Sequence, residues 1–222
     1  LGKLTRLNFS IDVLHYDRIY EARVEACDRI RKKHNLSDTD FVTAMVGKLI
    51  SKKRQLDLIK ALSLIDSDQF PKITCFIIGT GEDSAKLKEA ARKLQYQNVI
   101  FTDFVKPEEL SSYYAACTVY THTASYEPHS LAISEAIYLG VPCLISSNCG
   151  SYGPSDDVID GYNGWVYEFS DFNSLAEKWV ELNDNKNNLK SFGIRSREYA
   201  LKAQSLAHGE ALLTALRADK LL

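Results

Sequence analysis

Hydrophobic positions along the chain follow two spacings, and stretches of the two kinds alternate. Compact runs rich in β-branched residues are typical of buried strands. They occur at 41–47, 73–78, 99–101, 118–122, 142–145 and 165–169. Between these runs hydrophobic residues recur every three to four positions, which predicts amphipathic helices. The predicted helices cover 17–34, 54–65, 84–94, 107–116 and 131–139, with three further helical stretches from 174 to about 216.

Strands that alternate with helices predict right-handed βαβ crossovers and a parallel sheet covered by helices on both faces. The expected fold class is therefore α/β, a doubly wound, Rossmann-like sheet with a C-terminal helical appendage. We divide the chain into a leading segment with its helix (1–40), the Rossmann-like domain (41–186) and the C-terminal helices (187–222). Such sheets bind ligands at the carboxyl ends of their strands, so a site is expected in the turns that follow the strands.

The turn after the first predicted strand combines a glycine with positive charge. Gly47 is followed by Lys48, Lys52, Lys53 and Arg54, and a predicted helix begins there. A flexible backbone, cationic side chains and a helix N-terminus are the components of a phosphate site. A solvated lysine cluster is the alternative interpretation of the same residues.

The turn after the second predicted strand contains two glycines. Gly79 and Gly81 allow a ligand to approach the backbone closely, or they serve only to turn the chain. Ser84 stands where the last glycine of a GxGxxG fingerprint would be. A nicotinamide-dinucleotide site is therefore not predicted.

Two carboxylates eight positions apart follow the fourth predicted strand. Pro128 disfavours a helical conformation at Glu127, and Ser130 is a candidate N-cap, so Glu127 is expected in the mouth of the turn. Glu135 is expected further along the helix, roughly 7–8 Å from Ser130. The hydrophobic positions from Leu131 onward predict a buried helix, where an unpaired carboxylate would cost several kcal/mol. A hydroxyl-bearing ligand for Glu135 would remove that cost, whereas a surface helix position is the alternative.

Composition excludes several classes of function. The 27 Lys and Arg residues are balanced by 29 Asp and Glu residues, giving a net charge of −2, so neither nucleic acid nor an anionic membrane is an expected partner. The longest hydrophobic runs are strand-sized, so no transmembrane segment is predicted. Cys75, Cys117 and Cys143 lie in hydrophobic, strand-like runs, which predicts reduced core cysteines, no metal site and a cytoplasmic protein. The chain starts at Leu1 without a signal-peptide pattern, and we expect it to be a piece of a longer protein.

Several segments together resemble a known family. They are VGKLISKKRQLDLIKAL, FIIGTGED, VIFTDFVKPEELSSYYAAC, the Glu127-x7-Glu135 segment that ends in LGVPCLIS, and DGYNGWVYE. In order and spacing they resemble the C-terminal domain of family 4 retaining glycosyltransferases, one half of a GT-B fold. The resemblance covers nearly the whole chain, and residues 8–12 resemble the stretch that follows the interdomain linker of that family. It implies a domain that binds a nucleoside diphosphate sugar without a metal or other cofactor, and a missing N-terminal domain that holds the acceptor sugar or lipid-linked glycan.

The resemblance also implies roles for the charged residues. Lys48, where the family usually has Arg, and Lys53 would neutralise the diphosphate as the leaving group gains negative charge. Glu127 would lie near the hydroxyls of the transferred sugar. Glu135 would accept hydrogen bonds from both ribose hydroxyls, since an ionised carboxylate only accepts.

Other positions are implied to bind the rest of the donor. The backbone N–H groups of Ser130 and Leu131 would meet phosphate oxygens at the start of the helix. Gly79 would let the ligand lie against the backbone, and Phe104 and Val105 occupy the place where the family holds the nucleobase.

The chain departs from the family in the turn that carries the first glutamate. Pro128 and Ser130 replace two glycines; Pro128 has no N–H, and serine is expected to resist backbone angles that glycine adopts freely. His129 either hydrogen-bonds the sugar or phosphate or is merely solvated. The turn at 150–157 is longer than the Gly-Gly turn and glutamate of the family, so the acid that takes the place of this glutamate stays open.

Three functions are compatible with these observations. The first is a hexosyltransferase that transfers a glycosyl unit to an acceptor hydroxyl with retained stereochemistry, in polysaccharide or glycolipid synthesis. The second is a nucleotide-sugar epimerase-like domain, which the Glu-x7-Glu spacing disfavours. The third is a degenerate, non-catalytic nucleotide-binding module, which the loss of the two glycines favours.

Overall fold

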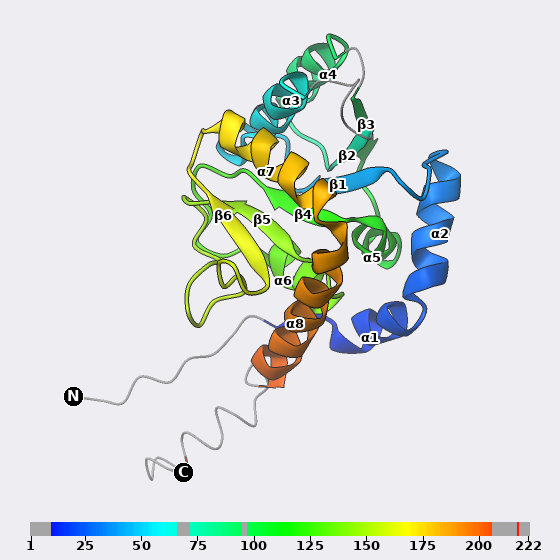
Figure 1. Ribbon diagram of the computed structural model, residues 1–222, viewed down its shortest axis with the longest axis vertical. Coiled ribbons are helices and arrows are strands. Elements are labelled where there is room, and N and C mark those ends of the chain that lie inside the picture. The colour runs from blue at the N-terminus through cyan, green and yellow to red at the C-terminus, as the bar shows by residue number, and fades with distance from the viewer. Residues whose placement is uncertain (1–9, 66–71, 95–96, 206–216, 218–222) are drawn as a thin grey trace, which may run out of the picture.

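The computed structural model describes residues 10–65, 72–94, 97–205 and 217. Within these ranges six strands form one parallel sheet, in the order β3-β2-β1-β4-β5-β6 (Figure 1). The strands are β1 (Phe41–Val46), β2 (Ile73–Ile78), β3 (Asn98–Asp103), β4 (Val119–His122), β5 (Cys143–Ser146) and β6 (Gly164–Tyr167). The predicted α/β class, with its doubly wound parallel sheet, is confirmed.

Helices connect the strands and extend the chain at both ends. They are α1 (Val13–Glu21), α2 (Arg23–Lys33), the 3-10 turn η1 (Ser51–Lys53), α3 (Gln55–Ser63), α4 (Ser84–Ala91), α5 (Pro107–Ala116), α6 (Leu131–Tyr138), α7 (Phe172–Asp184) and α8 (Lys186–Ser205). The single helix expected over 17–34 is wrong: it begins earlier and is interrupted at Ala22. Of the three helical stretches expected from 174 onward, α7 and α8 are present, and residues 206–216 lie outside the described residues.

The four central strands of the sheet are buried on both faces, whereas the edge strands β3 and β6 are only partly buried. Alternate residues of each strand face opposite helical layers. Val42 packs into a core with α1, α2, α5 and α6, whereas Phe41 packs into a second core with α3, α4 and α7. A parallel sheet buried in this way requires near-continuous hydrophobic strands, which explains why its strands were recognisable from sequence. None of the described helices is long and apolar enough to cross a membrane.

The strand order contains one reversal, and it determines where a ligand can bind. The chain runs outward from β1 to β3, then returns so that β4 pairs with the other side of β1, with Thr43 opposite Val119. The connections after β1 and β4 therefore leave in opposite directions. At such a reversal doubly wound sheets bind their ligands between the carboxyl ends of the two strands, and we call this position, between the ends of β1 and β4, the crevice.

Candidate functional site

The loops that follow β1 and β4 are tied together by hydrogen bonds at this crevice. The Ser125 N–H donates to the Lys52 carbonyl oxygen at 2.8 Å, and the Thr123 hydroxyl donates to the Lys53 carbonyl oxygen at 2.9 Å. The Gln55 side chain donates to the Lys48 carbonyl oxygen at 2.9 Å. The backbone of the cationic loop is thus fixed against the acidic loop, so the side chains of both project from one rigid frame.

Lys53 and Glu127 form an ion pair at the centre of this frame. The Lys53 side chain lies over Gly47, whose φ of +151° favours glycine, and its ammonium bonds to Oε2 of Glu127. The Lys53 side chain is 21% exposed to solvent and the Glu127 side chain 17%, so the pair is mostly buried while still open to a ligand. The nearby His122 ring and the Lys53 ammonium lower the pKa of Glu127 to about 2, although burial opposes them. The structure therefore brings together two residues separated by 74 positions that the sequence singled out independently.

His122 is a buried member of this cluster that sequence reasoning missed. The Val46 N–H donates to the Tyr120 hydroxyl, and that hydroxyl lies 3.2 Å from Nδ1 of His122. Nε2 lies 3.6 Å from Oε2 of Glu127, and a proton there is favoured over a lone pair that faces the ionised carboxylate. The ring proton is therefore on Nε2, and Nδ1 accepts from the Tyr120 hydroxyl. Burial lowers the pKa of His122, so the ring is neutral at pH 7. Nε2 has no hydrogen-bond partner among the described residues, although it is fully buried.

The 3.6 Å separation decides how Glu127 is held. It exceeds a normal hydrogen-bond length, so the His122 ring acts on the carboxylate through its dipole, and the direct bond comes from Lys53. The sequence signal for His122 was its position: it ends a strand immediately before the acidic turn and shares a face with Tyr120.

Glu135, on α6, has hydrogen-bond partners other than Lys53 and His122. The Tyr114 hydroxyl donates to Oε2 of Glu135 at 2.9 Å, and the Tyr16 hydroxyl also hydrogen-bonds to this carboxylate. Burial raises the pKa of Glu135 despite these two donors. The sequence argument that Glu135 would be unpaired without a ligand is therefore wrong. Its role toward ribose stays a prediction.

The start of α6 differs from expectation in four ways. Ser130 occupies the N-cap position, but its side chain makes no capping hydrogen bond. Its φ of −119° and ψ of 113° are ordinary extended values, so the expected backbone strain is absent. Its N–H donates to the Ser151 hydroxyl at 2.9 Å rather than being free, and Leu131, expected to be buried, keeps 48% of its exposure.

His129 and the long turn at 150–157 meet on α6. Nε2 of His129 lies 3.2 Å from the Ser134 hydroxyl and 3.8 Å from the Asp157 carboxylate. The Ser134 hydroxyl donates to Asp157 at 2.6 Å. Asp157, an acidic residue of that turn, is therefore held beside this helix, and His129 is anchored by side chains rather than merely solvated.

The remaining predicted residues lie around the same edge of the sheet. A Cβ atom on Gly79 would be 2.1 Å from the Gly47 carbonyl oxygen, and the φ of Gly79 is +136°. The contact between the two loops thus requires glycine here, whether or not a ligand also lies against it. Phe104, directly after β3, keeps 73% of its exposure, whereas Val105 packs against the core.

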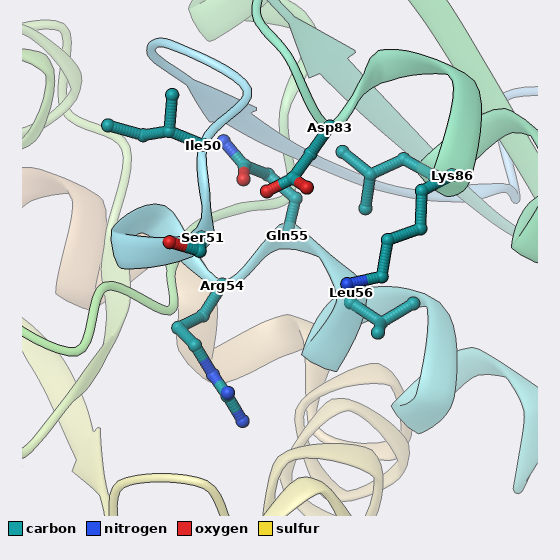
Figure 2. Close-up of a pocket in the computed structure, with 8 residues that line it drawn as sticks. Ile50, Ser51, Arg54, Gln55, Leu56, Asp83 and Lys86 are labelled. Carbon is teal, nitrogen blue, oxygen red and sulfur yellow. The ribbon is translucent and has the colours of Figure 1, made fainter.

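A small cavity adjoins the cationic loop. It has a volume of about 70 Å³, and Figure 2 shows Arg54 and Gln55 reaching it from the start of α3, with Asp83 and Lys86 on the side of α4. Ligand pockets for small molecules span about 300–1,000 Å³, so this cavity is too small for a nucleotide sugar. Across the described ranges, no group of three or more His, Cys, Asp and Glu side chains is placed to hold a metal ion.

Comparison with known proteins identifies the family. The family model for glycosyl transferases group 1 matches residues 27–199. The chain belongs to this family. Its crevice between β1 and β4 is therefore the crevice of a group 1 glycosyltransferase domain, the Rossmann-like half found in GT-B enzymes.

Two curated group 1 relatives are longer than this chain. A GDP-mannose-dependent monoacylated alpha-(1-6)-phosphatidylinositol monomannoside mannosyltransferase of Corynebacterium glutamicum is 27% identical over 87% of the chain and 49% of the relative. A poly(glycerol-phosphate) alpha-glucosyltransferase of Bacillus subtilis is 25% identical over 76% of the chain and 24% of the relative. The chain spans half or less of the length of these proteins.

Solved structures agree on the fold. The catalytic domain of cholesterol-alpha-glucosyltransferase from Helicobacter pylori is 30% identical, with a TM-score of 0.64 over 73% of this chain and 98% of that one. HepE of Anabaena, solved in complex with UDP-glucose, has a TM-score of 0.76 over 94% of this chain and 57% of that one, at 20% identity. The second likeness shows the fold alone.

Proposed function

We propose that this chain is the donor-binding domain of a hexosyltransferase that uses a nucleoside diphosphate sugar, needs no metal, and retains the stereochemistry at the anomeric carbon. The observation that carries the proposal is the Lys53–Glu127 pair at the crevice between β1 and β4. The pair places a cation for the diphosphate beside an acceptor for sugar hydroxyls, at the point where this fold binds ligands. Membership of a glycosyltransferase family supplies the reaction class.

The chemistry required of the site is stabilisation of a leaving group. The bond between the anomeric carbon and the diphosphate oxygen breaks, a bond to the acceptor oxygen forms, and the acceptor proton leaves to the diphosphate. Lys53, and the exposed Lys48 on the same loop, stabilise the negative charge that develops on the diphosphate, a task that other enzymes give to a metal ion. Glu127 stays ionised at pH 7 and accepts hydrogen bonds from hydroxyls of the transferred sugar.

The nucleoside end of the donor lies further along the sheet edge in this proposal. Glu135 accepts from the ribose hydroxyls in addition to, or in exchange for, its two tyrosine donors. The exposed ring of Phe104 contacts the base, and the N–H of Leu131, the first residue of α6, contacts a phosphate oxygen. His129, anchored by Ser134, faces the same turn and contacts the sugar or phosphate.

In the whole enzyme, we place the acceptor site outside this chain. We infer that a further, N-terminal domain of the whole enzyme holds an acceptor sugar or lipid-linked glycan in a cytoplasmic protein; the chain spans half or less of its two longer relatives, which leaves room for such a domain. The names of the Corynebacterium and Bacillus relatives, a phosphatidylinositol mannoside enzyme and a poly(glycerol-phosphate) enzyme, support a polysaccharide or glycolipid acceptor. The five cysteines, all free in the structure, support the cytoplasmic location.

One observation favours a second function, a degenerate module that binds a nucleotide without transferring sugar. The Ser130 N–H, which the family would offer to a phosphate, is hydrogen-bonded to the Ser151 hydroxyl. Pro128, in the same turn, has no N–H to offer.

Calorimetric titration tests both functions. The chain is titrated with UDP, GDP and ADP and with their common sugar conjugates, first in EDTA and then with Mg²⁺. We expect one diphosphate series to bind in EDTA, and the sugar conjugate to bind at least as tightly as the bare diphosphate. Binding that requires Mg²⁺ would contradict the metal-free mechanism. Binding of the diphosphate with exclusion of every conjugate would favour the degenerate module.

A further inference from the structure

A second and larger cavity lies at the opposite edge of the sheet. Its volume is about 420 Å³, and Thr118 and Pro142, which line it, directly precede β4 and β5. The cavity is therefore at the amino ends of these strands, whereas the Lys53–Glu127 pair is at their carboxyl ends. The other lining residues come from the end of α1, the start of α2, the end of α5, the α6–β5 turn and α8: Tyr20, Arg23, Cys117, Gly140, Lys186, Leu189, Lys190, Gly193 and Ile194.

The charge of this lining is entirely positive. Arg23, Lys186 and Lys190 line the cavity, and no Asp or Glu is among the lining residues. The chain as a whole carries a net charge of −2, so three cations gathered without a carboxylate are a local feature. The Lys186 ammonium donates to the Thr39 carbonyl oxygen at 2.7 Å, which holds it in place and leaves two of its three donors for a ligand.

Arg23 is a partly buried cation that lies in this cavity without an anionic side-chain partner among the described residues. Its guanidinium lies against Gly140, where a Cβ atom would be 3.3 Å from its NH1. Within the described part of the chain it makes no hydrogen bond or ion pair with another side chain, and burial lowers its pKa. Arg23 is partly buried, so its guanidinium is partly removed from water without a partner, which is unfavourable, and an anion entering the cavity would offset that cost.

The backbone around the cavity is arranged so that α8 can pass close to the α6–β5 turn. A Cβ atom on Gly193 would be 2.6 Å from the Gly140 carbonyl oxygen, so glycine is needed at the crossing. Beside the crossing, Leu189 and Ile194 add apolar surface to the lining. The cavity thus combines cationic groups with an apolar wall, and its volume is within the range of small-molecule sites, about 300–1,000 Å³.

We propose that this cavity is a binding site for a phosphomonoester, with the phosphate held by Arg23, Lys186 and Lys190 and the organic part against the apolar wall. Guanidinium and ammonium groups together form charge-assisted hydrogen bonds to the three terminal oxygens of such an ester. A soluble sugar or glycerol phosphate and the headgroup of phosphatidic acid both carry this group. The site is separate from the proposed donor crevice and does not depend on it.

The test is an NMR titration of the ¹⁵N-labelled chain with glycerol 3-phosphate. Gly140 and Gly193 report on the cavity, and Gly47 and Gly79 report on the donor crevice. We expect the first pair to shift in a saturable manner, and Arg23→Gln and Lys190→Glu each to weaken binding about tenfold or more. Lys190 is exposed, so its substitution leaves the fold intact even if Arg23→Gln does not.

Control variants separate this site from the donor crevice and from general charge effects. Lys53→Ala removes the cation of the crevice and is expected to leave the Gly140 and Gly193 shifts unchanged. Lys93→Ala, at an exposed position after α4, removes a positive charge outside the cavity lining and is expected to do the same. Absence of saturable shifts at Gly140 and Gly193, or shifts that survive Lys190→Glu at full strength, would overturn the proposal.

Vesicle binding distinguishes the two sources of the phosphomonoester. Sedimentation with phosphatidylcholine vesicles that contain phosphatidic acid is compared between the parent chain and Lys190→Glu. Binding to these vesicles that the substitution abolishes identifies a lipid headgroup. Binding to glycerol 3-phosphate without sedimentation identifies a soluble ester, and failure of both probes contradicts the site.

Discussion

Glu127→Gln tests the electrostatic core of the site. In the structure the carboxylate is bonded to Lys53 and faces the His122 ring, and its pKa falls from an ordinary 4.5 to about 2. A shift of this size corresponds to roughly 3 kcal/mol of folding free energy at neutral pH. Because the folded-state pKa is the lower one, this stabilisation is complete above pH 4.5 and is lost as the pH falls toward 2. Glutamine keeps the shape but not the charge, so the variant should be less stable at pH 7 by up to about that amount.

The assay is urea denaturation followed by circular dichroism at pH 7, 5, 4 and 3. The difference in unfolding free energy between parent and variant should be constant from pH 7 to 5. Below pH 4.5 unfolding of the parent takes up a proton at Glu127, whereas the variant has no carboxyl group there. Unfolding of the parent therefore becomes more favourable as the pH falls, and the difference should shrink by about 1.4 kcal/mol per pH unit. Contributions from other titrating groups cancel in this comparison. Glu177→Gln, an exposed position on α7, serves as the matched control.

A pH-independent difference between parent and variant would refute this reasoning. If the difference between parent and Glu127→Gln stays constant from pH 5 to pH 3, the Glu127 carboxylate does not have a depressed pKa and the ion pair with Lys53 does not hold it. A second contrary result would come from the control. If the difference in unfolding free energy between parent and Glu177→Gln also shrinks below pH 4.5, the effect comes from overall charge rather than from the ion pair.

Three further predictions concern the surroundings of the pair. Gly79→Ala should destabilise the chain by more than about 2 kcal/mol in urea denaturation, because its Cβ would meet the Gly47 carbonyl oxygen, whereas Gly161→Ala, with open space around it, should cost about 1 kcal/mol from its positive φ alone. His122→Phe should destabilise by about 1–3 kcal/mol, because the buried Tyr120 hydroxyl loses its acceptor; an unchanged midpoint would show that the hydrogen bond is not formed. Glu135→Ala should weaken nucleotide binding in calorimetry, and equal affinity for parent and variant would remove Glu135 from the ribose site.

The fold was predictable because its determinants are local. Strands buried on both faces give hydrophobic runs, such as 41–46 and 73–78, that no surface helix would produce. The break at Ala22 was not predictable, because charged residues continue at helical spacing through it and Asp12 caps a helix that starts before the expected one. The position of this N-cap depends on where the chain turns before α1, and the spacing of the hydrophobic residues does not encode that turn.

The candidate site was predictable only in part. Lys53 and Glu127 were found because each lies in the loop that follows a strand, and neighbouring parallel strands bring such loops together. The tyrosine partners of Glu135 were not found, because Tyr16 lies on α1, more than a hundred positions away, and its contact is set by packing between helices. His122 escaped notice because its only signal is its position at the end of a buried strand before the acidic turn, and a core histidine can occupy the same position.

The most direct test of the central claim is the affinity of Lys53→Ala for a nucleoside, the corresponding diphosphate and the corresponding diphosphate sugar, measured by calorimetry in EDTA. The structure predicts that the nucleoside binds parent and variant equally, whereas both diphosphate forms bind the variant about tenfold or more weakly, since a charge-assisted bond to phosphate is lost. Equal affinity of parent and Lys53→Ala for the diphosphate sugar would contradict the assignment of this crevice as a metal-free donor site.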